Sequence, residues 1–250
     1  SVVTYLAQLH GNSVTTLDRL APATRFANAA IAYLAYLSKT FWPANLAVFY
    51  PHPGISPEGD TTDAAFLWRG AAASVLLTVL TLLFCVLGRK NRYLTVGWLW
   101  FFGTLVPVIG IVQVGSQSFA DRYTYLPHIG IFIMIAWGVP DLFRGLVGRR
   151  AVLKGAAIAT ISGCCIVSIF QIRHWQNGVT LFSHNFAVCP HPKVEYSLGS
   201  ALLRAGRPTE AVAHFENVLG DWPDDAATLN LYGVALHLQG RKREALTHYR

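Results

Sequence analysis

The sequence has little charge and few residues for sulfur or metal chemistry. Lys, Arg, Asp and Glu make up 13% of the 250 residues, about half the share in soluble domains, while 53% are hydrophobic. The four cysteines have neither the spacing of a zinc site nor the pattern of a disulfide framework. No G-x-x-x-x-G-K, H-E-x-x-H or G-x-S-x-G motif is present. The composition therefore favours a membrane protein, and we expect no metal site.

Positive charge is concentrated in the first two thirds of the chain. Residues 1–170 hold 12 Lys and Arg against 6 Asp and Glu, whereas residues 171–250 hold 8 against 7. Basic residues between apolar segments are typical of loops that set membrane topology, and a nucleic-acid-binding surface explains them less well. We expect a lipid bilayer as a partner and no nucleic acid.

Four long uncharged segments predict membrane-spanning helices. Each has close to the roughly 20 residues that an α-helix needs to cross the hydrocarbon of a bilayer. The segments are residues 70–88, 95–114, 126–143 and 155–172. We expect them to form a helical bundle within a membrane domain at residues 1–172.

An earlier apolar segment, residues 26–43, is ambiguous because it contains Lys39 and ends at Pro43. It either crosses the bilayer with the Lys39 ammonium extended to the interface, or it lies in the interface or re-enters the membrane. The second alternative is favoured.

Spacings of three and four residues place one set of side chains on a single helix face, namely Arg25, Ala29, Ala32, Tyr36 and Lys39.

Two short basic loops predict the orientation of the spans. Their basic residues are Arg89, Lys90 and Arg92 in the first loop and Arg144, Arg149, Arg150 and Lys154 in the second. Short loops rich in Lys and Arg stay on the cytoplasmic side. Residues 44–66, the Asp121–Arg122 pair and the chain after residue 172 are then expected on the outer side. That side is the periplasm at a bacterial inner membrane, or the lumen of the endoplasmic reticulum.

The last third of the chain has a repeated helical pattern. Matched residues recur 34 positions apart, which is the tetratricopeptide period. The matched pairs are Gly199 and Gly233, Gly206 and Gly240, Ala211 and Ala245, and Phe215 and Tyr249. Glu195 stands at the position where the pattern usually has Trp. We predict a linker and capping helix at 173–191 and repeats at 192–250. The fold class is therefore all-α, with a polytopic transmembrane helix bundle followed by a tetratricopeptide-repeat α-solenoid.

A short polar stretch, residues 119–128, separates two apolar runs. The upstream run of 28 residues and the downstream run of 18 contain no charge, whereas Asp121 and Arg122 stand side by side between them. Placing charged groups between membrane-spanning segments costs free energy, and such groups usually have a function. We expect His128, at the end of this stretch, to be a hydrogen-bonded interior residue, and His52, in the separate loop at 51–60, to be a solvated loop residue.

Three stretches together resemble the transmembrane-and-tetratricopeptide O-mannosyltransferases, within the integral-membrane C-type glycosyltransferases. They are YLAYLSKTFWPANLAVFYP at 33–51, ADRYTYLPHIGIF at 120–132, and the positions Trp175, Leu181–Phe182 and Cys189–Pro190. The resemblance implies transfer of a sugar from a polyprenyl-phosphate carrier to a protein or glycan acceptor on the outer face. It also implies that the repeats bind the acceptor or another protein.

The family places its catalytic acid in the first outer loop, so no catalytic residue is assigned in this sequence. We expect that loop to lie upstream, because the chain starts at Ser1 and stops within a helical pattern. What remains would include groups that bind the carrier phosphate. Arg122 can grip a phosphate through two parallel hydrogen bonds, Asp121 could orient it, and Tyr123 could add a hydroxyl donor. Lys39 is a second candidate cation.

Other interpretations stay open. Asp121 and Arg122 could form an interfacial ion pair that anchors a helix end, with Tyr123 as an interface aromatic residue. The whole protein could be a membrane-anchored tetratricopeptide scaffold without catalysis. It could also be an enzyme resembling an O-antigen ligase or polymerase with fused repeats.

Overall fold

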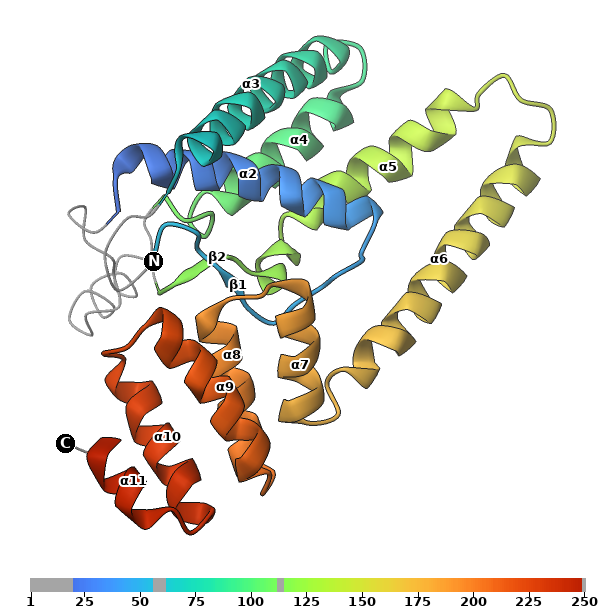
Figure 1. Cartoon of the computed structure of the whole chain (residues 1–250). Coiled ribbons are helices and arrows are strands. Elements are labelled where there is room, and N and C mark those ends of the chain that lie inside the picture. Colours follow the sequence, from blue (N-terminus) through green and yellow to red (C-terminus); the bar gives the residue numbers. More distant parts are fainter. Residues whose placement is uncertain (1–19, 56–61, 112–114, 249–250) are drawn as a thin grey trace. The chain divides into compact units, whose positions relative to one another are not determined.

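The computed structural model describes residues 20–55, 62–111 and 115–248, and this part of the chain is all-α, as predicted. Figure 1 shows the helices in chain order. Their bounds are α2 Pro22–Phe41, α3 Ala64–Leu87, α4 Arg92–Leu105, η1 (a 3-10 helix) Asp121–Thr124, α5 His128–Leu142, α6 Arg149–Arg173, α7 Gly178–Val188, α8 Pro192–Arg204, α9 Pro208–Asp221, α10 Ala226–Leu238 and α11 Lys242–His248. Two very short strands are β1, Tyr50–Pro51, and β2, Gln117–Phe119.

The chain forms two compact units, which are described separately. The first contains the described residues up to Ala44 together with His52–Val167, and the second contains Asn45–Pro51 together with Ser168–Arg250. The boundary therefore falls inside α6. Residues 45–51 group with the C-terminal unit, although both helices that flank them in sequence, α2 and α3, belong to the first.

Helices α3, α4 and α5 form the body of the first unit. Asp63 caps α3 by accepting a hydrogen bond from the Phe66 amide at 2.8 Å. Helix α4 returns beside α3 and is joined to it by the bond from the Trp98 indole to the Thr81 hydroxyl at 2.9 Å. Helices α4 and α5 meet at Gly97 and Gly130, where a Cβ on either residue would collide with the carbonyl oxygen of the other. Glycine at both positions is what allows this close approach.

Helix α2 crosses α3 in Figure 1 and does not run parallel to it. The two helices are closest where Gly70 faces Ala27, since a Cβ at Gly70 would overlap the Ala27 backbone. Of the five residues predicted to share one face of α2, four are buried, namely Arg25, Ala29, Ala32 and Tyr36. The fifth, Lys39, is half-buried.

Two helices in the described residues are long and apolar enough to cross a membrane, namely α3 and α6. The other two predicted spans coincide with shorter helices. Helix α4, which covers the start of the run at 95–114, ends at Leu105, and α5 has 15 residues. Both fall short of the roughly 20 residues that a perpendicular crossing requires. The set of four spans therefore stays a prediction.

The second unit contains helix pairs that alternate as the 34-residue period predicts. Helices α8 and α9 form one pair, and α10 and α11 form the next. Gly206 and Gly240 lie between the helices of each pair with φ of 73° and 82°, a left-handed conformation that favours glycine. Ala211 and Ala245 are fully buried at matched positions. Helix α7 packs onto this core through Val179, Phe182 and Phe186.

The expectation for His52 is wrong, because its side chain is 1% exposed. Its backbone amide donates to the Ser116 carbonyl at 3.0 Å, and its Nδ1 accepts from the Gly54 amide at 3.0 Å. The loop is therefore held against the chain before β2. Its Pro and Gly content predicted a turn, but could not reveal this distant partner.

Candidate functional site

The polar stretch at 119–128 lies against one face of α2. Three α2 side chains contact the chain from Ser118 to His128. The Asn28 amide donates to the Ser118 carbonyl at 3.0 Å, and the Thr40 hydroxyl lies 2.8 Å from Nε2 of His128. Between them, the Tyr36 hydroxyl contacts both backbone polar groups of Ala120 at 3.1 Å. The expectation that His128 is a hydrogen-bonded interior residue is confirmed.

This arrangement presents η1 immediately after Ala120. The Tyr123 amide donates to the Ala120 carbonyl at 3.0 Å, and the Thr124 hydroxyl donates to the Asp121 carbonyl at 2.7 Å. These bonds form one tight turn that carries Asp121, Arg122 and Tyr123. The turn begins where the Tyr36 hydroxyl holds the backbone, so α2 determines where the three side chains lie.

Arg122 is exposed on this turn. Its guanidinium lies 5.1 Å from the Tyr123 ring centroid and 3.4 Å from the Gln117 side-chain oxygen. The Gln117 amide in turn donates to the Tyr123 hydroxyl at 2.8 Å. None of the four ion pairs in the described part of the chain involves Arg122. The guanidinium is thus oriented by neutral neighbours and keeps donors for an anion.

The remaining predicted residues lie close to this turn in the fold. Asp121 is the first residue of η1. Lys39 lies on α2 between Tyr36 and Thr40, the two residues that bond to Ala120 and His128. Lys39 therefore belongs to the α2 turn that supports the polar stretch, although it precedes Asp121 by 82 positions in sequence.

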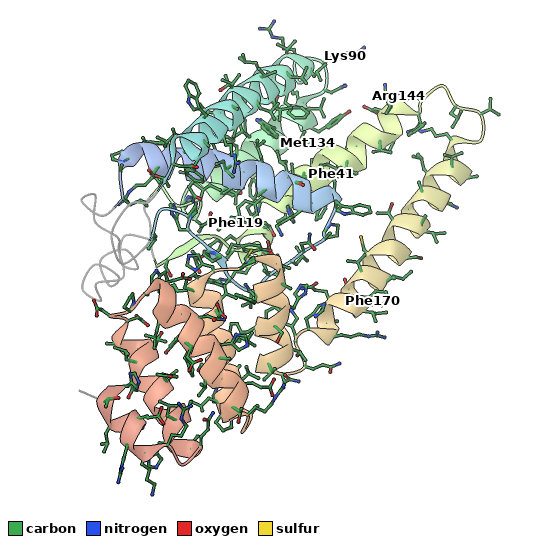
Figure 2. All side chains as sticks on the ribbon, viewed as in Figure 1. Phe41, Lys90, Phe119, Met134, Arg144 and Phe170 are labelled. Carbon is green, nitrogen blue, oxygen red and sulfur yellow. The ribbon has the colours of Figure 1, made fainter. Side chains whose placement is uncertain are left out.

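The basic loops lie at the other end of the first unit. Figure 2 shows Lys90 and Arg144 near neighbouring helix ends, with Phe119 far from both. The Tyr93 hydroxyl donates to the Asp141 carboxylate at 2.9 Å, which joins the start of α4 to the end of α5. The two groups of basic residues therefore share one end, and the Asp121–Arg122 turn occupies the opposite end.

An apolar pocket of about 380 Å³ lies between α2, α3, α4 and α5. Its lining contains no charged side chain and consists of Leu37, Phe41, Leu80, Phe84, Leu94, Trp98, Ile131, Met134, Ile135, Gly138, Val139 and Leu142. Figure 2 labels two of these residues, Phe41 at the end of α2 and Met134 on α5. Leu37 and Phe41 line the pocket from the same α2 turn that contains Lys39. The pocket can accommodate a hydrocarbon chain but offers no group for chemistry.

The repeats contain a polar cluster that the period alone does not predict. The carboxylate of Glu195 is 7% exposed and accepts from Nδ1 of His214 at 3.0 Å and from the Asn217 amide at 2.8 Å. The sequence shows that Glu195 replaces the usual Trp at this position. It does not show that the Glu195 carboxylate on α8 forms hydrogen bonds to His214 and Asn217 on α9.

Residues 196–250 match the family model described as tetratricopeptide repeat. The chain also matches a second group of proteins. Over 158 residues the chain is 25% identical to the human protein named Protein O-mannosyl-transferase TMTC4, an alignment that covers 59% of this chain and 21% of that protein. The chain is similar to the TMTC O-mannosyl-transferases.

Two TMTC1 proteins show the same relationship. Mouse TMTC1 is 26% identical over 173 residues, and human TMTC1 is 27% identical over 178 residues. Each alignment covers 66% of this chain, but only 18% and 20% of the respective TMTC1 protein. The chain therefore spans about a fifth of the length of the TMTC proteins it matches. No solved structure matches the chain.

Proposed function

We propose that this chain is part of an integral-membrane glycosyltransferase that moves a sugar from a polyprenyl-phosphate carrier to a protein or glycan acceptor. The similarity to proteins named O-mannosyl-transferases supports the reaction class. The observation that carries the proposal is the exposed Arg122 guanidinium on a turn fixed by α2, at the end of the unit opposite the basic loops.

In this proposal Arg122 and Lys39 bind the carrier phosphate. As the sugar leaves, negative charge develops on the phosphate, and preorganised cationic donors stabilise that charge most strongly where water is scarce. Tyr123 adds a hydroxyl donor, and Asp121 is the residue next to Arg122 on the same turn. The apolar pocket beneath Leu37 and Phe41 would hold the start of the polyprenyl chain.

The same geometry supports a placement in the membrane. Helices α3 and α6 would cross the bilayer, while α2 would lie in the outer interface, because it crosses α3 and its polar face meets the Asp121–Arg122 turn. The basic ends of α3–α5 would face the cytoplasm. The turn and the repeats would then face the periplasm or the lumen of the endoplasmic reticulum, where the repeats could bind an acceptor protein.

The decisive experiment is sugar transfer by the full-length protein carrying Arg122→Gln. We expect transfer from a polyprenyl-phosphate mannose to fall about 10²–10³-fold, the usual effect of removing one donor to a developing anion. Arg144→Gln is the control, since Arg144 is exposed and pairs with Asp141 at the basic end. Full transfer by Arg122→Gln would refute the phosphate role. A protein that binds acceptor without any transfer would support the scaffold alternative instead.

Orientation is tested separately by thiol labelling. Ala213→Cys introduces a thiol at an exposed position of α9, and Gly145→Cys introduces one at an exposed position between α5 and α6. A membrane-impermeant maleimide added from outside should label Ala213→Cys in intact membranes and should label Gly145→Cys only after permeabilisation. The reverse pattern would overturn the orientation.

A further inference from the structure

A second groove lies between α2 and α3, away from the Asp121–Arg122 turn. It has a volume of about 340 Å³. Its lining comprises Ile31 and Leu34 from α2 and Arg69, Ala72, Ala73 and Leu76 from α3. All of these residues except Arg69 are apolar, so the groove is apolar apart from one cationic side chain.

Small side chains create the groove. Helices α2 and α3 are in close contact at Ala27 and Gly70, which keeps their backbones near each other. On the next α3 turn, Ala72 is exposed and its methyl group leaves space that a larger side chain would fill. Leu76 is 46% exposed one turn further on. The channel therefore runs along α3 away from Arg69, at the surface of the unit.

The length of α3 indicates where Arg69 lies in a bilayer. The 18 residues from Gly70 to Leu87 span about 27 Å at 1.5 Å per residue, close to the roughly 30 Å of bilayer hydrocarbon. Arg69 is the residue immediately before this stretch, so in a bilayer crossed by α3 its guanidinium would be at the level of the lipid phosphates. Trp68 beside it is 76% exposed, as is typical of interfacial tryptophan.

Arg69 takes part in none of the ion pairs formed among the described residues. Guanidinium groups bind phosphate oxygens through paired charge-assisted hydrogen bonds. A phosphate at Arg69 would place the attached glycerol and acyl chain directly over Ala72 and Leu76.

We propose that this groove binds one anionic glycerophospholipid, with its phosphate on Arg69 and one acyl chain along the Ala72–Leu76 channel. An anionic lipid is favoured over a zwitterionic one because the headgroup of the latter carries its own cation, which competes for the phosphate. The proposal depends on α3 crossing the bilayer and is independent of sugar transfer.

Native mass spectrometry of the delipidated full chain in detergent, titrated with phosphatidylglycerol, tests the site. We expect one tightly bound lipid, and about tenfold weaker binding for Arg69→Gln, the effect of one charge-assisted hydrogen bond. Arg89→Gln, at the other end of α3, should bind as the unmodified chain does. Phosphatidylcholine should bind at least tenfold more weakly than phosphatidylglycerol.

A steric pair tests the channel while Arg69 is retained. Ala72→Leu should weaken phosphatidylglycerol binding by filling the groove. Ala71→Leu, at the adjacent exposed position that does not line the groove, should leave binding unchanged. Equal binding by Arg69→Gln and Arg89→Gln would overturn the proposal, and so would equal binding by Ala72→Leu and Ala71→Leu. Sugar transfer does not enter either readout, so failure here leaves the proposed function untouched.

Discussion

The hydroxyl of Tyr36 donates to the carbonyl of Ala120 and accepts from the amide of the same residue, both at 3.1 Å. One side chain on α2 thus satisfies both backbone polar groups of the residue that precedes Asp121. Ala120 is 3% exposed, so water cannot replace the hydroxyl easily. The position of Arg122 consequently depends on a residue 86 positions earlier in the chain.

Replacing Tyr36 with Phe should loosen the Asp121–Arg122 turn. The change leaves the buried Ala120 amide without its acceptor, at a cost of about 1–3 kcal/mol, whereas the Ala120 carbonyl keeps the Tyr123 amide as a donor. Hydrogen–deuterium exchange of the peptide covering residues 117–124 should become faster. Tyr33→Phe is the control because its hydroxyl bonds to the distant Phe102 carbonyl. Equal exchange at 117–124 in the two variants would contradict the role assigned to Tyr36.

The segment at 45–51 should detach locally when Asn185 is changed. The Asn185 side chain is fully buried, accepts from the Phe49 amide at 2.8 Å and donates to the Phe49 carbonyl at 3.0 Å. Asn185→Asp keeps the acceptor but removes the donor, which should cost about 1–3 kcal/mol. We expect faster proteolysis at residues 45–51 and unchanged proteolysis in α10. Resistance equal to that of the unmodified protein would refute the prediction.

The Glu195 cluster should show strong coupling between α8 and α9. Glu195→Leu leaves His214 and Asn217 without the carboxylate, and we expect a loss of about 1–3 kcal/mol in the free energy of unfolding of the repeats. The double variant Glu195→Leu with His214→Leu should lose less than the sum of the two single variants. Additive losses in denaturant unfolding would show that the 3.0 Å contact contributes nothing.

The first turn of α8 should weaken in acid. Nδ1 of His191 accepts from the Lys193 amide at 3.1 Å and caps the helix. Burial lowers the pKa of His191 below its usual 6.5, and the Lys193 charge lowers it further. Because the folded pKa is depressed, the stabilisation is complete above about pH 6.5 and is lost as the pH falls through the folded pKa.

The substitution His191→Asn isolates this effect. Asn is a good helix cap that does not titrate in this range. Exchange protection of residues 193–195 should decrease from pH 7 to pH 5 in the unmodified chain and stay nearly constant in the variant, after correction for intrinsic rates. His237→Asn, at an exposed position of α10, should behave as the unmodified chain does.

The repeats could be predicted from sequence because their constraints are local. Gly206 and Gly240 are required by a left-handed turn, and Ala211 and Ala245 by close helix packing. Each requirement recurs after 34 residues, so the second copy of the pattern supports the assignment of the first. The shared α2 face was predictable for a similar reason, since its members lie three and four residues apart, but the burial of most of them was not predicted.

The site was only partly predictable because its supporting contacts are long-range. The sequence marked Asp121 and Arg122 by their charge, and Lys39 by its place in an apolar segment. Nothing local indicates that Asn28, Tyr36 and Thr40 form the surface on which the stretch at 118–128 lies. The helices also differ in length from the apolar runs that predicted them. Hydropathy indicates which residues avoid water but does not indicate where helical hydrogen bonding stops, which for α4 is at Leu105.

The connection between α2 and α3 has a consequence for dividing the molecule. The Leu46 carbonyl accepts from Gln171 at 3.2 Å and from His184 at 3.0 Å, and Phe49 pairs with Asn185. The C-terminal unit is therefore discontinuous in sequence, since part of its hydrogen bonding is supplied by residues that precede α3. A polypeptide ending at residue 167 would lack the partners of Leu46 and Phe49. One beginning at residue 168 would expose the buried Asn185 side chain, so no single cut yields two complete units.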